Sequence, residues 1–104
     1  MTNIKPIKKS DISKLIEIKK DVFDYSKTVE DFENYYNESS IKIWKISTTK
    51  IVGFVSFYYI KDEVEIIQIG IDKPYRRKNF GSLLINKIKK LYNLKKIFID
   101  VSVE

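Results

Sequence analysis

Cysteine and histidine are both absent from the 104 residues of the chain. Without them the protein has no disulfide, no thiolate nucleophile and no zinc site of the Cys/His type, and we predict no bound metal. A general base would have to be a carboxylate, a tyrosine, a lysine or water. The lack of cysteine also agrees with a reducing compartment, so we expect a cytoplasmic location.

Glycine, proline and long apolar runs are scarce as well. Three glycines and two prolines exclude collagen-like and low-complexity classes. The apolar fraction of 43% is enough for one hydrophobic core, so residues 1–104 are predicted to form a single domain. The first residues lack the apolar stretch of a secretory signal, and no apolar run reaches the roughly 18 residues of a membrane span. We therefore expect no membrane partner.

Acidic side chains are missing from one long stretch of the sequence. Residues 73–96 contain nine Lys or Arg and no Asp or Glu, whereas the rest of the chain has eleven basic and fourteen acidic residues. The net charge of +6 therefore comes from one region. A local basic excess predicts a phosphate-bearing partner, either a nucleotide cofactor or a nucleic-acid backbone.

The spacing of the apolar residues changes between the helical and the strand period along the chain. The predicted elements are an extended segment 2–7, a helix 11–23 capped by Ser10, a second helix after Thr28, three strands of an antiparallel meander over 41–71, a helix after Ser82 and a strand within 96–103. This order, β-α-α-β-β-β-α-β, predicts a mixed α/β fold. The strand, helix and strand over 64–103 predict a parallel pair with a right-handed crossover.

The last predicted strand is followed directly by Glu104, the final residue of the sequence. Nothing after it would cover the edge of the sheet, and an uncovered edge is unfavourable in an independent domain. The sequence therefore predicts either a C-terminally truncated fold or a partner, such as a second copy in a homodimer, that covers this edge.

The stretch 68–82 has the character of an anion-binding site. A strand ends, a turn rich in positive charge follows, and a helix begins near Gly81 and Ser82. The first turn of a helix has unpaired N–H groups and a partial positive charge, and small residues let an anion approach them closely. This arrangement predicts a pyrophosphate site.

The segment Arg76-Arg77-Lys78-Asn79-Phe80-Gly81 resembles the Gln/Arg-x-x-Gly-x-Gly/Ala motif of the GNAT family of N-acetyltransferases. One position departs from the motif, because Asn79 stands where the family usually has its first glycine. Asparagine is the next-best residue for a left-handed backbone. The flanking segments 69–75 and 82–85 also resemble the family. The resemblance implies a GNAT-like acyl-CoA N-acyltransferase fold that lacks the family's C-terminal helix and strands.

The same resemblance implies that the cofactor is acetyl-CoA. Backbone groups of the fourth strand would bind the pantetheine arm and the thioester, and the loop and helix start would hold the pyrophosphate. The residues implied in cofactor binding are Ile69, Gly70, Ile71, Arg76, Arg77, Lys78, Asn79, Phe80, Gly81 and Ser82. Many relatives have a β-bulge in the fourth strand, which separates it from the fifth, and Gly70 is the expected place for it here.

The implied reaction is acetyl transfer to a primary amine. Because only a neutral amine attacks, a base must take its proton, directly or through water. Comparison with relatives suggests Glu65 as that base and Asp100 as a second candidate, and it assigns no general acid. The chain is similar to the subgroup that acetylates protein N-terminal amines, partly through residues 23–32, although small amines and polyamines remain open as acceptors.

Two other functions remain open at this point. The missing C-terminal third would fit a catalytically impaired relative that binds coenzyme A without turnover. The basic stretch 73–96 would fit a nucleic-acid-binding module, but neither a second recognition helix nor an exposed aromatic ribbon accompanies it.

Overall fold

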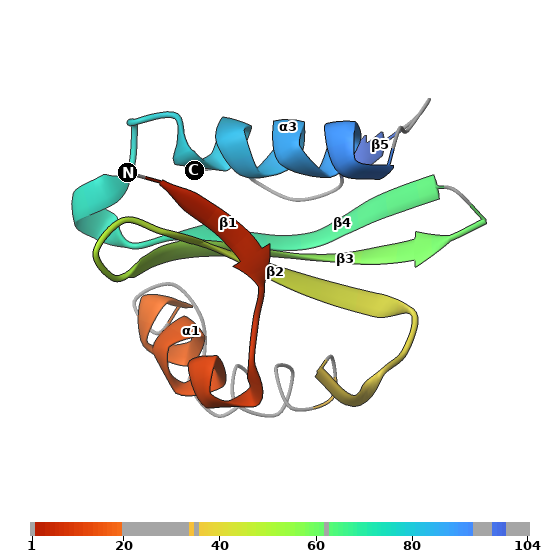
Figure 1. The fold of residues 1–104 in the computed structure, drawn as a ribbon, viewed down its shortest axis with the longest axis horizontal. Coiled ribbons are helices and arrows are strands. Elements are labelled where there is room, and N and C mark those ends of the chain that lie inside the picture. The colour runs from red at the N-terminus through yellow and green to blue at the C-terminus, as the bar shows by residue number, and fades with distance from the viewer. Residues whose placement is uncertain (1, 20–33, 35, 62, 93–96, 100–104) are drawn as a thin grey trace.

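A computed structural model describes residues 2–19, 34, 36–61, 63–92 and 97–99. Its elements are β1 (Asn3–Pro6), the 3₁₀ turn η1 (Lys9–Asp11), α1 (Ile12–Lys19), β2 (Ile41–Ser47), β3 (Ile51–Ile60), β4 (Glu63–Ile71), the 3₁₀ turn η2 (Lys73–Tyr75), α3 (Phe80–Tyr92) and β5 (Ile97–Ile99). Figure 1 shows a twisted sheet with α3 on one face and α1 on the other. The mixed α/β architecture predicted from the sequence is confirmed.

The five described strands form one sheet in the order β1-β2-β3-β4-β5. The first four pair antiparallel, as predicted for the meander. The last pair is parallel, with Val64–Ile66 of β4 beside Ile97–Ile99 of β5, and α3 forms the connection between them. The predicted parallel crossover is therefore confirmed.

The N-terminal part of the chain differs from the prediction in its helix cap. Ser10 is not the helix cap, because it lies inside η1. The N-cap of η1 is Lys8, and Asp11, three residues on, bonds back to it: its Oδ2 accepts a hydrogen bond of 2.8 Å from the Lys8 N–H. The second half of the predicted helix 11–23 and most of the helix expected after Thr28 lie outside the described residues.

Asp11 also pairs with Lys45 of β2, with 2.7 Å between Lys45 Nζ and Asp11 Oδ2. The two side chains are only 16% and 17% exposed, so the pair lies mostly away from water. Burial raises the pKa of the Asp11 carboxyl, but hydrogen bonds from Lys45 and from the Lys8 backbone outweigh it and hold the pKa below its usual value. This pair ties the start of α1 to the sheet.

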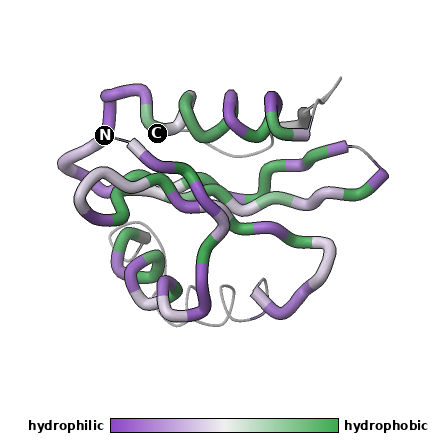
Figure 2. The backbone as a smooth tube through the Cα atoms, viewed as in Figure 1, coloured by the Kyte–Doolittle hydropathy of each residue, from purple (hydrophilic) through white to green (hydrophobic). Residues whose placement is uncertain are grey.

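Strand β3 is the centre of the hydrophobic core, because its residues 52–57 are all buried. Apolar clusters lie on both of its faces. Figure 2 colours the backbone by hydropathy and shows hydrophobic residues in the strands and in both helices. The larger cluster lies under α3 and includes Ile46, Val52, Val55, Phe57, Val64, Ile66, Ile69, Ile71, Leu84, Ile85 and Ile88. The smaller cluster lies under α1 and comprises Leu15, Ile16, Ile18, Ile41, Ile43 and Phe54.

The last residue of α3, Tyr92, anchors the helix on the sheet. Its ring lies 5.9 Å from that of Phe57 and 4.3 Å from that of Tyr59, measured between centroids. Burial raises the pKa of the Tyr92 hydroxyl, and a hydrogen bond with Trp44 acts in the opposite direction. The C-terminal end of α3 is therefore held by aromatic packing, which fixes the direction in which its N-terminal end points.

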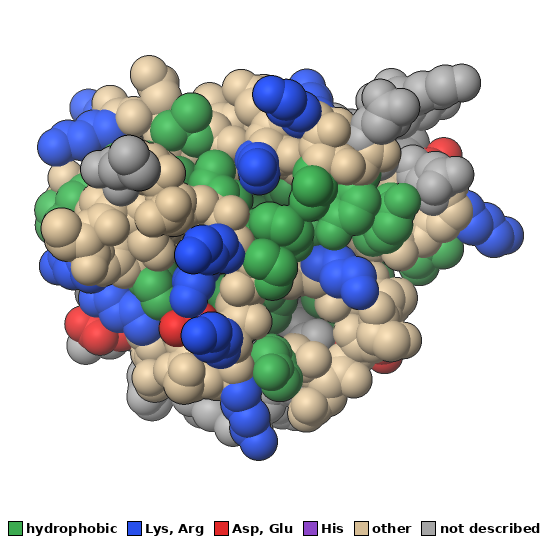
Figure 3. All heavy atoms as spheres, in the orientation of Figure 1, with side chains coloured by type: hydrophobic (Ala, Val, Ile, Leu, Met, Phe, Trp, Pro, Cys, Tyr) green, Lys and Arg blue, Asp and Glu red, His purple; other side chains and the backbone are tan. Residues whose placement is uncertain are grey.

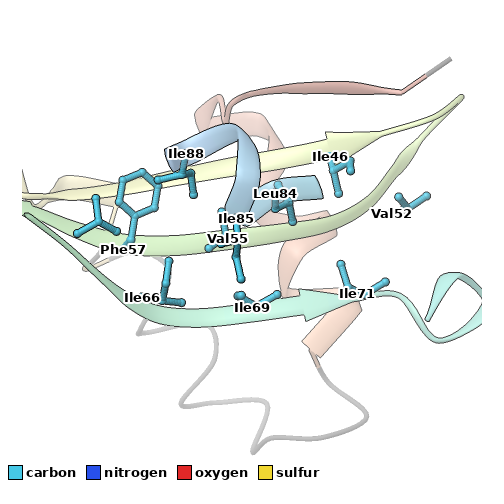
Figure 4. Packing of buried hydrophobic residues seen from close by; sticks show 11 residues of the cluster. Ile46, Val52, Val55, Phe57, Ile66, Ile69, Ile71, Leu84, Ile85 and Ile88 are labelled. Carbon is cyan, nitrogen blue, oxygen red and sulfur yellow. The ribbon is translucent and has the colours of Figure 1, made fainter. Parts of the chain in front are cut away.

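Strand β4 contains a bulge at Ile67. Ser56 pairs with Gln68 and Phe57 pairs with Ile66, so Ile67 has no opposite residue on β3. An extra residue shifts the alternation of side chains by one position. As a result Ile66 and Ile69, three residues apart, both point towards α3 (Figure 4).

The bulge expected at Gly70 is therefore wrong in position. Gly70 pairs in register with Phe54, and a Cβ on this glycine would lie 2.5 Å from Cε1 of the Phe54 ring. Gly70 lacks a side chain because the phenylalanine ring of the neighbouring strand occupies that space.

Candidate functional site

The turn that follows β4 is fixed by four hydrogen bonds. The Asp72 N–H donates to the Val52 carbonyl over 2.8 Å, and the Asp72 side chain accepts from the Lys73 N–H over 3.0 Å. The Tyr75 N–H then donates to the Asp72 carbonyl, and the Arg76 N–H donates to Lys73, which closes η2. The chain therefore enters the basic loop from a rigid start.

Two side-chain contacts close the base of this loop. Arg76 Nε donates to the carbonyl of Ile71, the last residue of β4, over 2.9 Å. The rings of Tyr75 and Phe80, one on each side of the loop, are 6.2 Å apart, and both pack against the core under α3. Arg76 thus holds the loop against the end of the strand.

The backbone of the loop turns sharply at two left-handed residues, Arg77 with φ of 62° and Asn79 with φ of 67°. The left-handed conformation predicted for Asn79 is confirmed. Runs of this kind, in which left-handed residues interrupt right-handed ones, turn successive N–H groups towards a common concavity that binds anions. The loop therefore has the backbone shape of an anion site.

Helix α3 begins directly after the loop. The Asn79 carbonyl accepts the Leu83 N–H over 3.0 Å, so Asn79 is the N-cap and Phe80 is the first helical residue. The amides of Phe80, Gly81 and Ser82 belong to the first turn, where N–H groups have no acceptor within the helix. The start predicted near Gly81 and Ser82 is correct to within a residue or two.

Positive charge surrounds this turn. Lys73, Arg77 and Lys78 are exposed, and the Nζ atoms of Lys50 and Lys78 lie 5.7 and 6.0 Å from the centre of the Tyr75 ring. The first turn of α3 contains no acidic residue. Lys and Arg also outnumber acidic side chains on the face shown in Figure 3.

Among the described helices, none is both long and apolar enough to cross a membrane.

The outer edge of β4 leads into the loop. In the described part of the chain its pairing with β5 covers Val64–Ile66 and ends immediately before the bulge at Ile67. Ile69, Gly70 and Ile71 lie between the end of this ladder and the loop. An extended ligand that carries amide groups would lie along such an edge as an added strand.

The ten residues predicted to bind a cofactor lie within the segment 69–82: three at the end of β4, four in the loop after η2 and three in the first turn of α3. The predicted catalytic pair is only half described. Asp100 lies outside the described residues, one position after Ile99, which pairs with Ile66.

Glu65 is exposed on β4, on the face of the sheet that α1 covers. It lies opposite Tyr58 of β3. Beside it is a pocket of about 420 Å³ lined by Tyr58, Ile60, Lys61, Glu63, Val64 and Glu65. The carboxylate is therefore accessible to a small molecule that enters from solvent.

Two polar residues close to Glu65 were missed by the sequence analysis. Ser56 is fully buried, and its Oγ has no hydrogen-bond partner within the described chain. The same holds for the buried Oε1 of Gln68, directly opposite on β4. The available signal was the one serine in the otherwise apolar and aromatic run 51–60.

The geometry is that of a mixed α/β domain with a basic loop at the junction of β4 and α3, whose left-handed residues give it the backbone shape of an anion site. The model of the Acetyltransferase (GNAT) family matches residues 11–104. The chain belongs to this family, and the resemblance found in the sequence is confirmed.

Solved structures support the fold. The ribosomal-protein-S18-alanine N-acetyltransferase from Escherichia coli is similar with a TM-score of 0.84 and 17% identity, over 97% of this chain and 67% of that one. For the ribosomal-protein-alanine N-acetyltransferase from Brucella melitensis the TM-score is 0.78 and the identity 14%, over 98% of this chain and 81% of that one. An aminoglycoside N-acetyltransferase in complex with CoA has a TM-score of 0.78 and 13% identity, over 98% of this chain and 78% of that one. No protein with a curated description matches the sequence significantly.

Acetyltransferases of this family use acetyl-CoA as the acetyl donor. The described residues fit such a molecule. The β4 edge suits the extended, amide-bearing pantetheine arm, and the left-handed loop with the first turn of α3 suits the diphosphate. The two features are adjacent, as the covalent connection between arm and diphosphate requires.

Proposed function

We propose that this protein is an N-acetyltransferase that transfers the acetyl group of acetyl-CoA to a primary amine. The observation that carries the proposal is the pair of left-handed residues Arg77 and Asn79 directly before the first turn of α3. Such a loop costs conformational energy and is useful to a protein that must hold an anion against backbone amides.

In this proposal the diphosphate of the cofactor binds to the backbone amides of residues 77–82. Exposed Arg77 and Lys78 add charge at the rim, while Arg76 acts through the strand carbonyl that it contacts. The pantetheine arm lies along Ile69–Ile71, with the thioester towards the bulge at Ile67. The cofactor thus crosses from the helix end to the part of β4 near Glu65.

Glu65 would act as the general base. Acetyl-CoA supplies an acetyl group activated as a thioester. The Glu65 carboxylate would take a proton from the protonated amine, directly or through water. The neutral nitrogen would then form a bond to the carbonyl carbon, the bond from carbon to sulfur would break, and the departing coenzyme A thiolate would take the second amine proton. The chain has no cysteine that would form an acetyl-enzyme, so we propose direct transfer. Asp100 remains the second candidate for the proton.

The acceptor is proposed as a primary amine because the similar structures include acetyltransferases for ribosomal-protein alanine and for aminoglycosides. An exposed Glu65 beside an open pocket of about 420 Å³ is compatible with either kind of amine. The protein N-terminal amine is our first choice, in line with the resemblance to that subgroup.

The test combines calorimetry and turnover. Titration of the chain with coenzyme A should show binding, and a thiol-release assay with acetyl-CoA should show turnover on at least one of an N-terminal alanyl peptide, spermidine and kanamycin. Binding without turnover on any amine would favour a catalytically impaired relative. Salt-dependent binding to duplex DNA with no response to coenzyme A would contradict the proposal and support the nucleic-acid module.

A further inference from the structure

The buried polar atoms Ser56 Oγ and Gln68 Oε1 are not explained by packing. Ser56 is the only buried polar residue within the described part of the chain, and its exposed fraction is 0%. Ser56 Oγ and Gln68 Oε1 both lack a hydrogen-bond partner among the described residues. An unpaired buried polar atom destabilises a fold, so its presence needs a reason.

The bulge at Ile67 decides where Gln68 points. Glu65 and Gln68 are three residues apart, and on a regular strand they would face opposite sides of the sheet. The extra residue restores them to one face: Val64, Ile66 and Ile69 pack under α3, so Glu65, between the first two, and Gln68, next to the third, lie on the α1 side. The proposed base and the unpaired amide oxygen therefore share one surface.

Three cross-strand pairs lie in a row on this face of the sheet. Tyr58 with Glu65 lies at the open pocket, Ser56 with Gln68 follows, and Phe54 with Gly70 comes last. On β3 the side chain of Tyr58 is exposed, and those of Ser56 and Phe54 are fully buried. Gly70 is one of the residues along which the pantetheine arm is proposed to lie. The Ser56–Gln68 pair thus lies between the solvent entrance and the proposed acetyl group.

The chemistry of the two atoms indicates the ligand. The Gln68 Oε1 can only accept a hydrogen bond, and the Ser56 Oγ can accept as well as donate. Residues directly opposite on antiparallel strands have Cβ atoms about 5 Å apart, so both side chains can reach one small group. A nitrogen with two N–H bonds satisfies both acceptors, whereas a carboxylate or phosphate would be repelled by the amide oxygen.

We propose that Ser56 and Gln68 bind the acceptor amine and orient its nitrogen for attack. This inference rests on the proposed acetyltransferase function, and it names residues of the acceptor site that the family resemblance did not supply. The amine enters in its protonated form with three N–H bonds: each side chain accepts one of them, and Glu65 takes the third proton, which frees the nitrogen lone pair for attack. The pair is specificity-determining, because this full set of contacts requires three N–H bonds, as in a protonated primary amine.

The test uses Ser56→Ala, Gln68→Met and the double variant in the full chain. Methionine keeps the length of glutamine without the amide. We expect coenzyme A affinity to stay within about twofold, and kcat/KM for the best amine of the panel to fall about tenfold or more in the double variant, mainly through KM. The urea midpoint should stay the same or rise, because unpaired buried atoms have been removed.

Val55→Ala is the matched control. Val55 is the sequence neighbour of Ser56 but faces the core under α3, so its truncation should lower the urea midpoint and leave the KM for the amine unchanged. A KM that follows stability across all these variants would show a structural role for the pair and overturn the inference.

A second readout does not depend on turnover. In the complex with coenzyme A, addition of the amine should shift the side-chain amide resonances of Gln68, and coenzyme A alone should not. Unchanged Gln68 resonances at a saturating amine concentration would overturn the inference even if the enzyme is active. A chain that binds no coenzyme A at all would instead refute the proposed function, so the two failures are distinguishable.

Discussion

Replacement of Asn79 tests the anion loop most sharply, because its role depends on backbone conformation. Asn79 has φ of 67° and is the N-cap of α3 through its carbonyl, which accepts the Leu83 N–H. Neither feature requires its side chain. Asn79→Val introduces a branched side chain that disfavours the left-handed region, and Asn79→Gly keeps that region freely accessible.

The size of the effect follows from the backbone. A left-handed conformation costs an ordinary residue about 1–2 kcal/mol, and asparagine less. If the loop keeps its shape in Asn79→Val, this amount is lost from the free energy of unfolding. If the loop relaxes in the free protein, the same amount is lost from the binding energy, and the Kd for coenzyme A rises about 5- to 30-fold. The two losses should therefore add to about 1–2 kcal/mol.

Urea unfolding and calorimetric titration with coenzyme A measure the two parts separately. Asn79→Gly should match the wild type in both within about twofold in Kd. The reasoning is refuted if Asn79→Val changes neither quantity, since the left-handed residue would then carry no cost. It is also refuted if Asn79→Gly weakens binding as much as the valine does, because the side chain would then be the important part.

Three further predictions concern other parts of the structure. Gly70→Ala should cost about 1–3 kcal/mol in urea unfolding, because the new Cβ would lie 2.5 Å from the Phe54 ring, and a second change, Phe54→Leu, should recover part of it. Asp11→Asn should destabilise the protein near neutral pH. The pKa of Asp11 is lower in the folded protein than in the unfolded chain, so its stabilisation is present above the unfolded pKa and disappears as the pH falls through the folded pKa. Urea unfolding at several pH values should therefore show that the stabilities of wild type and variant converge in acid. Glu65→Gln should lower kcat about 100-fold or more at unchanged coenzyme A affinity, and an active variant with the wild-type pH profile would exclude Glu65 as the base.

Much of the fold could be predicted because each element has its own pattern. The near-continuous apolar run 51–60 indicated a strand buried on both faces, and residues 52–57 are indeed buried. The apolar stripe of the helix after Ser82 indicated one buried face, which Leu84, Ile85 and Ile88 form. The left-handed conformation of Asn79 followed from the resemblance to the family motif, in which this position is usually glycine and asparagine is the next-best left-handed residue.

Other features depend on contacts that are distant in sequence. The position of the bulge was missed because Ile66 and Ile67 are both apolar, and β4 has apolar neighbours on both faces, so its pattern does not reveal which residue is extra. The N-terminal cap was assigned to Ser10 because serine is a common capping residue, whereas the structure has Lys8 as the cap of a short 3₁₀ turn that contains Ser10. The bond between Asp11 of this turn and Lys45 joins residues 34 positions apart, which no local pattern reveals.

The candidate site divides in the same way. The proposed cofactor site is local, so its ten residues were predicted from the one segment 69–82. The proposed acceptor site combines β3 with β4, and Ser56 and Gln68 lie opposite each other only through strand register and the bulge. Sequence patterns can therefore propose residues for the cofactor, but not the cross-strand pair proposed for the amine.

The central claim is that coenzyme A binds at the junction of β4 and α3. Backbone amide chemical shifts, recorded during a titration with coenzyme A, test it most directly. We predict the largest shifts at residues 77–82, with smaller ones at Ile69–Ile71, and little change along the lysine-rich face at Lys87 and Lys90 of α3. Largest shifts on that lysine face, or saturating coenzyme A without any shift in residues 77–82, would contradict the account.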